Sequence, residues 1–141
     1  MARIHIELPP QFSFSTEIPV LIQHINAANH LANEQLIALL NEARMRYMRT
    51  LPTGQFGIKA GAFINADLAV IYKGEGKYGD VLRIEIAAQD FSHYGCDFVY
   101  RVTTVADQRL IAIAKTAMLQ FDYNTGKLAA VSADFPALFN A

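Results

Sequence analysis

The sequence predicts an α+β fold, a curved antiparallel sheet of about five to six strands packed on one long central helix. A stretch around residue 40 repeats its apolar side chains at helical spacing, and the stretches after it alternate apolar and polar residues as β-strands do. With 141 residues, the chain is long enough for one hydrophobic core and too short for two ordinary ones. We therefore expect a single domain over residues 1–141.

Composition and charge narrow the class of protein. Hydrophobic residues make up 52% of the chain and charged residues 18%, which is too apolar for a disordered protein. The net charge of −1, without a stripe of basic residues, makes nucleic acid an unexpected partner. Cys96 is the single cysteine, no apolar run is long enough to cross a membrane, and the N-terminus lacks a signal peptide. We expect a cytoplasmic protein with no membrane partner.

The helix is predicted over residues 33–50. Leu36 and Leu40 belong to an apolar stripe that returns every three or four residues and marks the buried face. Asn33 is expected to cap the first turn with its side chain, and Pro52 is expected to end the helix.

The strands are predicted from an apolar spacing of two. The first is expected at residues 12–22, and the later ones at residues 63–73, 81–88, 94–106 and 109–122. The sequence ADQR joins the last two as a hairpin turn, and the last strand, apolar on both faces, is expected to be a central one. One helix cannot cover so long a sheet. The apolar area left over predicts a homodimer, and pairing of dimers into a homotetramer is left open.

The start of the predicted helix carries a recognisable pattern. Residues 30–44, HLANEQLIALLNEAR, resemble the helix start of hot-dog-fold thioesterases of the 4-hydroxybenzoyl-CoA thioesterase-like family, roughly D-x-D-x-x-G-H-V-N-N-A-x-Y-L before an E-A-R run. Without a gap, His30 falls on the motif histidine and Asn33 on its second asparagine. Further matches follow at Tyr72, Gly79, Asp80, Lys115, Thr116 and Asp122. The resemblance covers about residues 12–130.

The resemblance implies a hot-dog-fold hydrolase of acyl-CoA (or acyl-carrier) thioesters. Water would attack a thioester held at the helix N-terminus, in a cleft between two subunits. No cofactor is implied beyond the coenzyme A that forms part of the substrate. A helix N-terminus suits this reaction because its free N–H groups and partial positive charge polarise a carbonyl. The N–H groups near Asn33 and Glu34 are the candidates, unless an Asn33 cap uses them up.

The catalytic position departs from the family pattern. The family's catalytic carboxylate falls on Asn26, and the acidic residue two positions before it falls on His24. His24 is therefore predicted to be the general base, because imidazole titrates near neutral pH. Asn26 is predicted to orient water or the thioester, and His30 to bond the thioester carbonyl. Each has a structural alternative, which is packing for His24, turn hydrogen bonds for Asn26 and a backbone bond for His30.

Other polar residues are predicted to contact the substrate or shape its cleft. Asn29 replaces the motif glycine and is expected to take a left-handed backbone conformation. Lys73 is a candidate for the nucleotide phosphates, and Asp67, Ser92 and His93 are candidates for lining the cleft from the partner subunit. The substrate-binding set is Asn29, Asn33, Glu34, Asp67, Lys73, Ser92 and His93.

Two alternatives to hydrolysis remain open. The lack of an acid at residue 26 is compatible with a non-catalytic protein that binds an acyl thioester or a fatty acid, and a dehydratase of the same fold is a third possibility. No metal site is expected, because His24 and His30 are six residues apart in a loop without a nearby cysteine. Glu42 and Arg44 are expected to form an ion pair on the helix surface or in the dimer interface.

Overall fold

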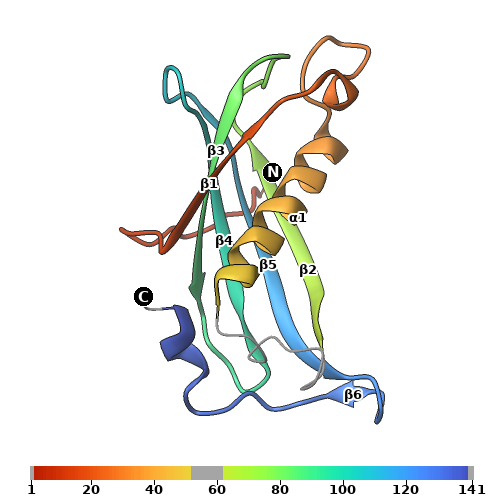
Figure 1. The fold of residues 1–141 in the computed structure, drawn as a ribbon, viewed down its shortest axis with the longest axis vertical. Helices are drawn as coiled ribbons and strands as arrows, with labels where there is room; N and C mark the ends of the chain where they lie inside the picture. The colour runs from red at the N-terminus through yellow and green to blue at the C-terminus, as the bar shows by residue number, and fades with distance from the viewer. Residues whose placement is uncertain (1, 52–61, 140–141) are drawn as a thin grey trace.

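The computed structural model describes residues 2–51 and 62–139, in which one long helix packs on a sheet (Figure 1). The helix is α1 (Asn33–Thr50). The long strands are β1 (Phe14–Pro19), β2 (Ala62–Tyr72), β3 (Val81–Gln89), β4 (Gly95–Thr104) and β5 (Leu110–Asp122). A short strand and two short 3-10 helices complete the described chain, namely β6 (Lys127–Leu128), η1 (Ile22–His24) and η2 (Phe135–Phe139).

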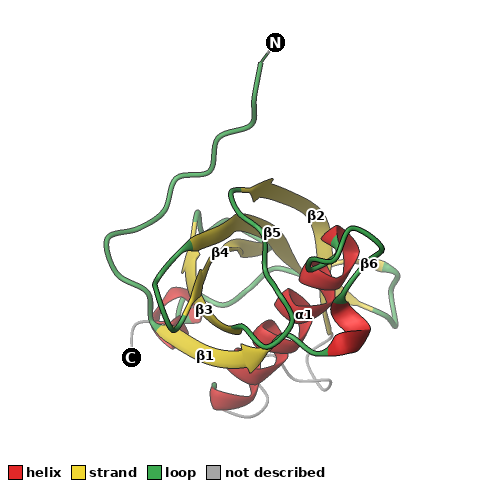
Figure 2. Cartoon of the chain, turned by 90° about the horizontal axis from the view of Figure 1, so that it is seen from above, coloured by secondary structure: helices red, strands yellow, loops and turns green. Residues whose placement is uncertain are grey.

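All described strands belong to one six-stranded antiparallel sheet. Its order is β1-β3-β4-β5-β2, and β6 pairs with β5. The sheet curves round α1 from β1 to β2, as the view from above shows (Figure 2). We call the face toward α1 the inner face and the opposite one the outer face. The predicted α+β fold, with a curved antiparallel sheet on one long helix, is confirmed.

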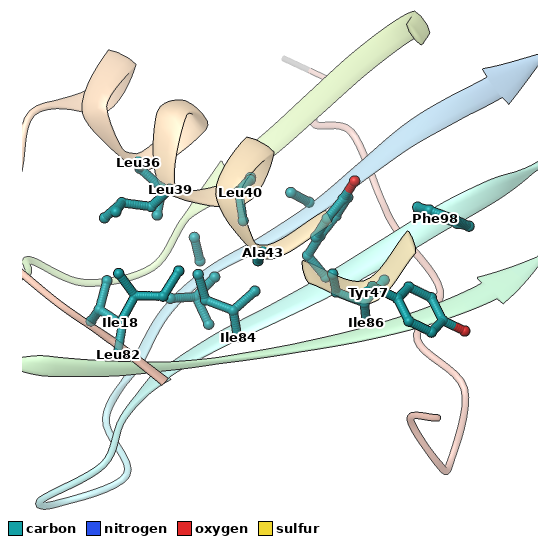
Figure 3. Close-up of a cluster of buried hydrophobic side chains, with 14 of the residues drawn as sticks. Ile18, Leu36, Leu39, Leu40, Ala43, Tyr47, Leu82, Ile84, Ile86 and Phe98 are labelled. Atoms are coloured by element: carbon teal, nitrogen blue, oxygen red, sulfur yellow. The ribbon is translucent and has the colours of Figure 1, made fainter. Parts of the chain in front are cut away.

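The core fills the space between α1 and the inner face. Leu36, Leu40 and Ala43 are fully buried because their spacing places them on one side of the helix. They join a cluster with Ile18, Leu82, Ile84, Ile86 and Phe98 of the sheet (Figure 3). The helix packs closest to β1 and β3. It therefore packs mainly on the β1 side of the curved sheet.

The helix has the predicted bounds, but its predicted cap is wrong. Ala32 is the N-cap residue, Asn33 is the first helical residue, and no side chain caps the first turn. An alanine side chain has no acceptor atom, so the capping role that the sequence predicted for Asn33 is not filled by its neighbour either. The helix ends at Thr50, and Pro52 lies outside the described residues.

The long strands lie within a few residues of their predicted positions, with two differences. β1 is shorter than predicted because the chain leaves the sheet and turns into η1. β5 is a central strand as predicted, because it pairs with β4 on one side and β2 on the other, but it is not covered on both faces. Outer-face residues of β5 such as Ile113 and Ala117 are only half-buried. β6 and η2 were not predicted, because such short elements leave no periodic pattern.

Candidate active site

A cavity of about 140 Å³ opens where α1 begins. It is enclosed by the loop before α1, the first turns of α1, the end of β2 and the segment that follows β2. Its lining residues are His30, Leu31, Asn33, Leu36, Tyr72, Gly74, Glu75, Gly76 and Ile111. The cavity thus brings together an imidazole, a carboxylate and a helix N-terminus.

A larger hollow of about 370 Å³ lies elsewhere, between the N-terminal segment and β3. Its lining includes Phe12, Ser13, Ala87 and Phe139, without a histidine, an acid or a lysine among the described residues. The Ser13 hydroxyl is already bonded to the Tyr47 hydroxyl at 2.7 Å. Because catalysis depends on converging polar groups more than on the volume of a cavity, the smaller cavity is the candidate active site.

The N-terminus of α1 offers backbone donors to this cavity. The N–H groups of Gln35 and Leu36 both donate to the carbonyl oxygen of Ala32, at 3.1 and 3.0 Å. The N–H groups of Asn33 and Glu34 precede them, and Ala32 supplies no side-chain acceptor. The alternative that an Asn33 cap occupies these donors is therefore wrong. The two N–H groups and the helix dipole form a site suited to an oxyanion.

Hydrogen bonds within residues 21–32 give His24 a structural position. Its Nδ1 accepts the N–H of Leu21 at 2.9 Å, and its carbonyl oxygen accepts the N–H of Ala32 at 2.9 Å. The side chain is buried and does not line the described cavity. Since Nδ1 is the acceptor, the neutral ring carries its proton on Nε2. The ring therefore ties the start of η1 together and has no lone pair left for a base.

Asn26 shapes the same loop. Its Oδ1 accepts the N–H of Ala28 at 3.0 Å and that of His30 at 3.4 Å, and its own N–H donates to the carbonyl oxygen of His30 at 3.0 Å. These are the turn hydrogen bonds of the structural alternative, and Asn26 is exposed. Asn29 has φ = 67°, which confirms its predicted left-handed conformation. Together the two asparagines close a tight turn that presents His30.

His30 is the imidazole that lines the cavity. Its Nδ1 lies 3.1 Å from the carbonyl oxygen of Leu31, which accepts only, so Nδ1 carries the proton. Nε2 is then unprotonated in the neutral ring, and it lies 4.0 Å from Oε1 of Glu75. This geometry leaves His30 with a free lone pair at the cavity.

Glu75 is the cavity's carboxylate, and it was not among the predicted site residues. Its Oε2 accepts a hydrogen bond from Lys77 Nζ at 3.0 Å. This bond, followed by the charge of Lys77, lowers the pKa of Glu75, so the group is ionised at neutral pH. Glycines flank it in the sequence GEG, and such glycines are the one signal of a close backbone approach that could have identified it.

A close contact between two loops brings Glu75 to His30. The N–H of Leu31 donates to the carbonyl oxygen of Gly76 at 2.8 Å, and a β-carbon at Gly76 would lie only 3.1 Å from that of Leu31. Arg109 fixes the other side, because its Nη1 donates to the carbonyl oxygen of Glu75 at 3.1 Å and its Nη2 to Asp80 at 3.1 Å. These hydrogen bonds therefore fix the position of Glu75 beside His30.

Tyr72 also reaches the site and was missed as a site residue. Its hydroxyl donates to the carbonyl oxygen of Asn33 at 3.3 Å and so links β2 to α1. Burial, followed by the charge of Glu34, raises the pKa of Tyr72. Glu34 is exposed in the first turn, and Lys73 is exposed directly before the segment that carries Glu75. The substrate contacts predicted for Glu34 and Lys73 stay predictions.

The remaining predicted residues lie away from this cavity within the chain. Asp67 is on the outer face, where its carboxylate accepts from Lys115 Nζ at 3.0 Å and from the N–H of Ala117 at 2.9 Å. Ser92 and His93 lie in the turn between β3 and β4. The cavity is at the other end of β3, whose nine residues span about 30 Å. A role for these three residues therefore depends on a partner subunit and stays a prediction.

The sequence model of the thioesterase-like superfamily matches residues 20–139. The chain belongs to this superfamily. A search of curated proteins found no match. Membership of the thioesterase-like superfamily makes hydrolysis of a thioester bond the activity class of this chain.

Solved structures share the hot-dog arrangement of this thioesterase-like chain. YbaW, a probable thioesterase from Escherichia coli, has a TM-score of 0.80 at 19% identity, covering 89% of this chain and 98% of its own. Slr0204, a 1,4-dihydroxy-2-naphthoyl-CoA thioesterase from Synechocystis, has a TM-score of 0.78 at 16% identity, covering 91% and 98%. SAV2348 from Staphylococcus aureus, solved in complex with CoA, has a TM-score of 0.80 at 16% identity, covering 96% and 86%. The predicted hot-dog fold is confirmed.

No group of three or more histidine, cysteine, aspartate or glutamate side chains in residues 2–51 and 62–139 is placed to hold a metal ion. In the same part of the chain, no helix is both long and apolar enough to cross a membrane.

Proposed function

We propose that the protein hydrolyses acyl-CoA, or acyl-carrier, thioesters by water attack at the N-terminus of α1. One observation carries this proposal. The cavity that holds the uncapped first turn of α1 also holds the free Nε2 of His30. An electrophile activated at the first group would lie beside a base at the second, which is the pairing that thioester hydrolysis needs.

The first step uses the backbone. The thioester carbonyl oxygen accepts hydrogen bonds from the N–H groups of Asn33 and Glu34, and the helix dipole adds to their effect. When water attacks the carbonyl carbon, the carbonyl electron pair moves onto this oxygen. The negative charge then develops where the donors already point.

The second step uses His30. Its Nε2 takes a proton from the attacking water, and its Nδ1–H remains bonded to the carbonyl oxygen of Leu31, which holds the ring in place. Collapse of the tetrahedral intermediate breaks the C–S bond. The imidazolium returns its proton to the leaving sulfur, and the products are a carboxylic acid and a free thiol.

We assign His24 and Asn26 to the loop rather than to the chemistry. The bond from the Leu21 N–H engages the lone pair that His24 would need as a base, and both acceptor bonds of Asn26 hold the turn before His30. Both act as positioning residues for His30. In this mechanism His30, which falls on the histidine of the family motif, acts as the base in place of the carboxylate that is missing at residue 26.

We further propose that the active form is a homodimer. β2 is an edge strand of eleven residues, and Leu68 and Tyr72 on its inner face are 45% and 44% exposed. A long unpaired edge beside exposed apolar side chains favours association with a second copy. The acyl group would lie along the same strand, and Lys73 would meet the nucleotide phosphates at the mouth of the cavity.

Thiol release from a panel of acyl-CoAs tests the proposal. A disulfide reagent such as Ellman's reports free CoA, and the protein's own thiol does not interfere because burial raises the pKa of Cys96 to about 12. We expect release with at least one acyl class and none from a buffer control. Binding of acyl-CoAs without release for any chain would instead support the acyl-thioester binding alternative.

Replacing Glu75 with glutamine is expected to lower kcat by about three- to tenfold. The carboxylate lies 4.0 Å from Nε2 and stabilises the positive charge that His30 gains when it takes the proton, so the loss should appear in kcat rather than in KM. The control is Glu7→Gln, which removes the acid of an exposed His5–Glu7 pair far from the cavity. A kcat that is unchanged in Glu75→Gln would contradict the role given to Glu75.

A further inference from the structure

Arg44 on α1 carries a positive charge that no described acid balances. Glu42, its expected partner, instead pairs with Arg46 at 2.8 Å, which corrects the sequence prediction. Within residues 2–51 and 62–139, Arg44 forms no ion pair with a carboxylate. Its Nη2 donates to Oδ1 of Asn41, and its Nη1 lies 3.4 Å from the Tyr100 hydroxyl. Both are neutral groups, so the guanidinium charge remains uncompensated.

The surroundings of Arg44 are partly withdrawn from water. Arg44 is half-buried, and the Tyr100 hydroxyl below it is fully buried and bonded to Thr116 Oγ1 at 2.7 Å. Burial is the main cause that raises the pKa of Tyr100, so this hydroxyl stays neutral. A guanidinium keeps further N–H donors beyond the two bonds described. Such donors beside buried hydroxyls suit a carboxylate better than they suit water alone.

The inner face of β2 connects Arg44 to the cavity. Thr116, which bonds Tyr100, is paired across the sheet with Leu68 of β2. Leu68 is 45% exposed and Tyr72, at the cavity, is 44% exposed, although the inner face of the neighbouring strands is buried. The reason is the position of α1, which packs closest to β1 and β3. Leu68 and Tyr72 are therefore exposed on the inner face of β2, one on each side of Val70, which is half-buried and packs against the core.

The distance along β2 from Tyr72 to Leu68 is similar to the distance along α1 from Asn33 to Arg44. Four residues of β2 separate Tyr72 from Leu68, a distance of about 13 Å along the strand. Eleven residues of α1 separate Asn33 from Arg44, about 16 Å along the axis, and an arginine side chain on a helix leans back toward the N-terminus. An acyl group whose carbonyl lies at Asn33 and whose chain follows β2 would end beside Arg44.

We infer that Arg44 selects acyl groups that carry a carboxylate at the end remote from the thioester. The preferred substrates are thus medium-length dicarboxylic acyl thioesters. Arg44 neutralises the distal carboxylate, and Asn41 orients the guanidinium. This inference rests on the proposed thioester hydrolysis and adds to it the class of acyl group.

A matched pair of substrates tests the inference. Octanoyl-CoA and suberyl-CoA have the same number of acyl carbons and differ only in the terminal carboxylate. We expect kcat/KM for suberyl-CoA to exceed that for octanoyl-CoA by at least about tenfold. In Arg44→Met the ratio should fall by about 10- to 100-fold, chiefly through KM for suberyl-CoA, with octanoyl-CoA turnover retained as evidence of a folded enzyme. Arg49→Met removes an exposed charge from the same helix and should leave the ratio unchanged.

The outcomes separate this inference from the proposed function. Absence of turnover with both substrates and with the wider panel would overturn the proposed function. Turnover without a preference for suberyl-CoA, or a preference that survives Arg44→Met, would overturn only the role of Arg44. Loss of dimer in Arg44→Met with an unchanged substrate ratio would also overturn it, because the charge would then serve the contact between subunits.

Discussion

Replacing His30 with glutamine is expected to lower kcat/KM for thioester hydrolysis by about 10²- to 10⁴-fold, the range usually lost with a general base. Glutamine retains an amide N–H that can bond the carbonyl oxygen of Leu31, so the loop should stay folded. It has no group that accepts a proton from water at neutral pH. The loss should therefore appear in kcat, with a far smaller change in the melting temperature.

Two histidine controls sharpen this result. His5→Gln makes the same change at an exposed position of the N-terminal segment, far from the cavity, and should leave turnover near its original value. His24→Gln should lower the melting temperature, because it disturbs the bond from the Leu21 N–H that holds η1. Full turnover in His30→Gln together with loss in His24→Gln would return the base to His24.

Replacing Asn33 with proline is expected to lower kcat by about 10²- to 10³-fold. Proline lacks the backbone N–H that we assign to the thioester oxyanion, and it suits the first position of a helix. Ala32, which would precede it, has φ = −68° and ψ = 146°, a conformation that proline tolerates in the residue before it. The substitution therefore removes one donor while α1 remains formed, as far-UV circular dichroism can check.

Asn33→Ala is the matched control for this experiment. It removes the asparagine side chain from the cavity but keeps the N–H, so kcat should remain within a fewfold of the original. Equal losses in Asn33→Pro and Asn33→Ala would show that the side chain matters and that the backbone donor does not. The pair thus separates an electrostatic role of the helix N-terminus from a side-chain contact.

The helix and the long strands could be predicted because their signals are local and repetitive. Residues 33–50 carry an amphipathic spacing that only a helix satisfies, and their bounds agree with α1. The prediction of Asn33 as the N-cap was wrong because the capping preference considers residue type alone. It favours Asn33 by its side chain, whereas the backbone had already become helical there, after Ala32. Residue preferences for the N-cap do not show at which residue the backbone becomes helical.

The chemistry of the site was less predictable, because it depends on contacts between distant segments. His30 and Glu75 are 45 residues apart, and they meet because the Leu31 N–H bonds the carbonyl oxygen of Gly76. His24 was ranked first from its place in the family motif. Its hydrogen bond to Leu21, which only the folded backbone defines, argues against that rank. The sequence spacing placed both histidines in one loop, but it could not show which imidazole nitrogen is left without a hydrogen bond.

The most direct measurement of the central claim is a crystal structure with an acyl-CoA analogue in which a methylene replaces the thioester sulfur. Such a ketone keeps the carbonyl and cannot be hydrolysed. The account predicts its oxygen about 2.7–3.1 Å from the N–H nitrogens of Asn33 and Glu34, with a water at His30 Nε2. A carbonyl bound away from the first turn of α1, or a water activated by another group, would contradict it.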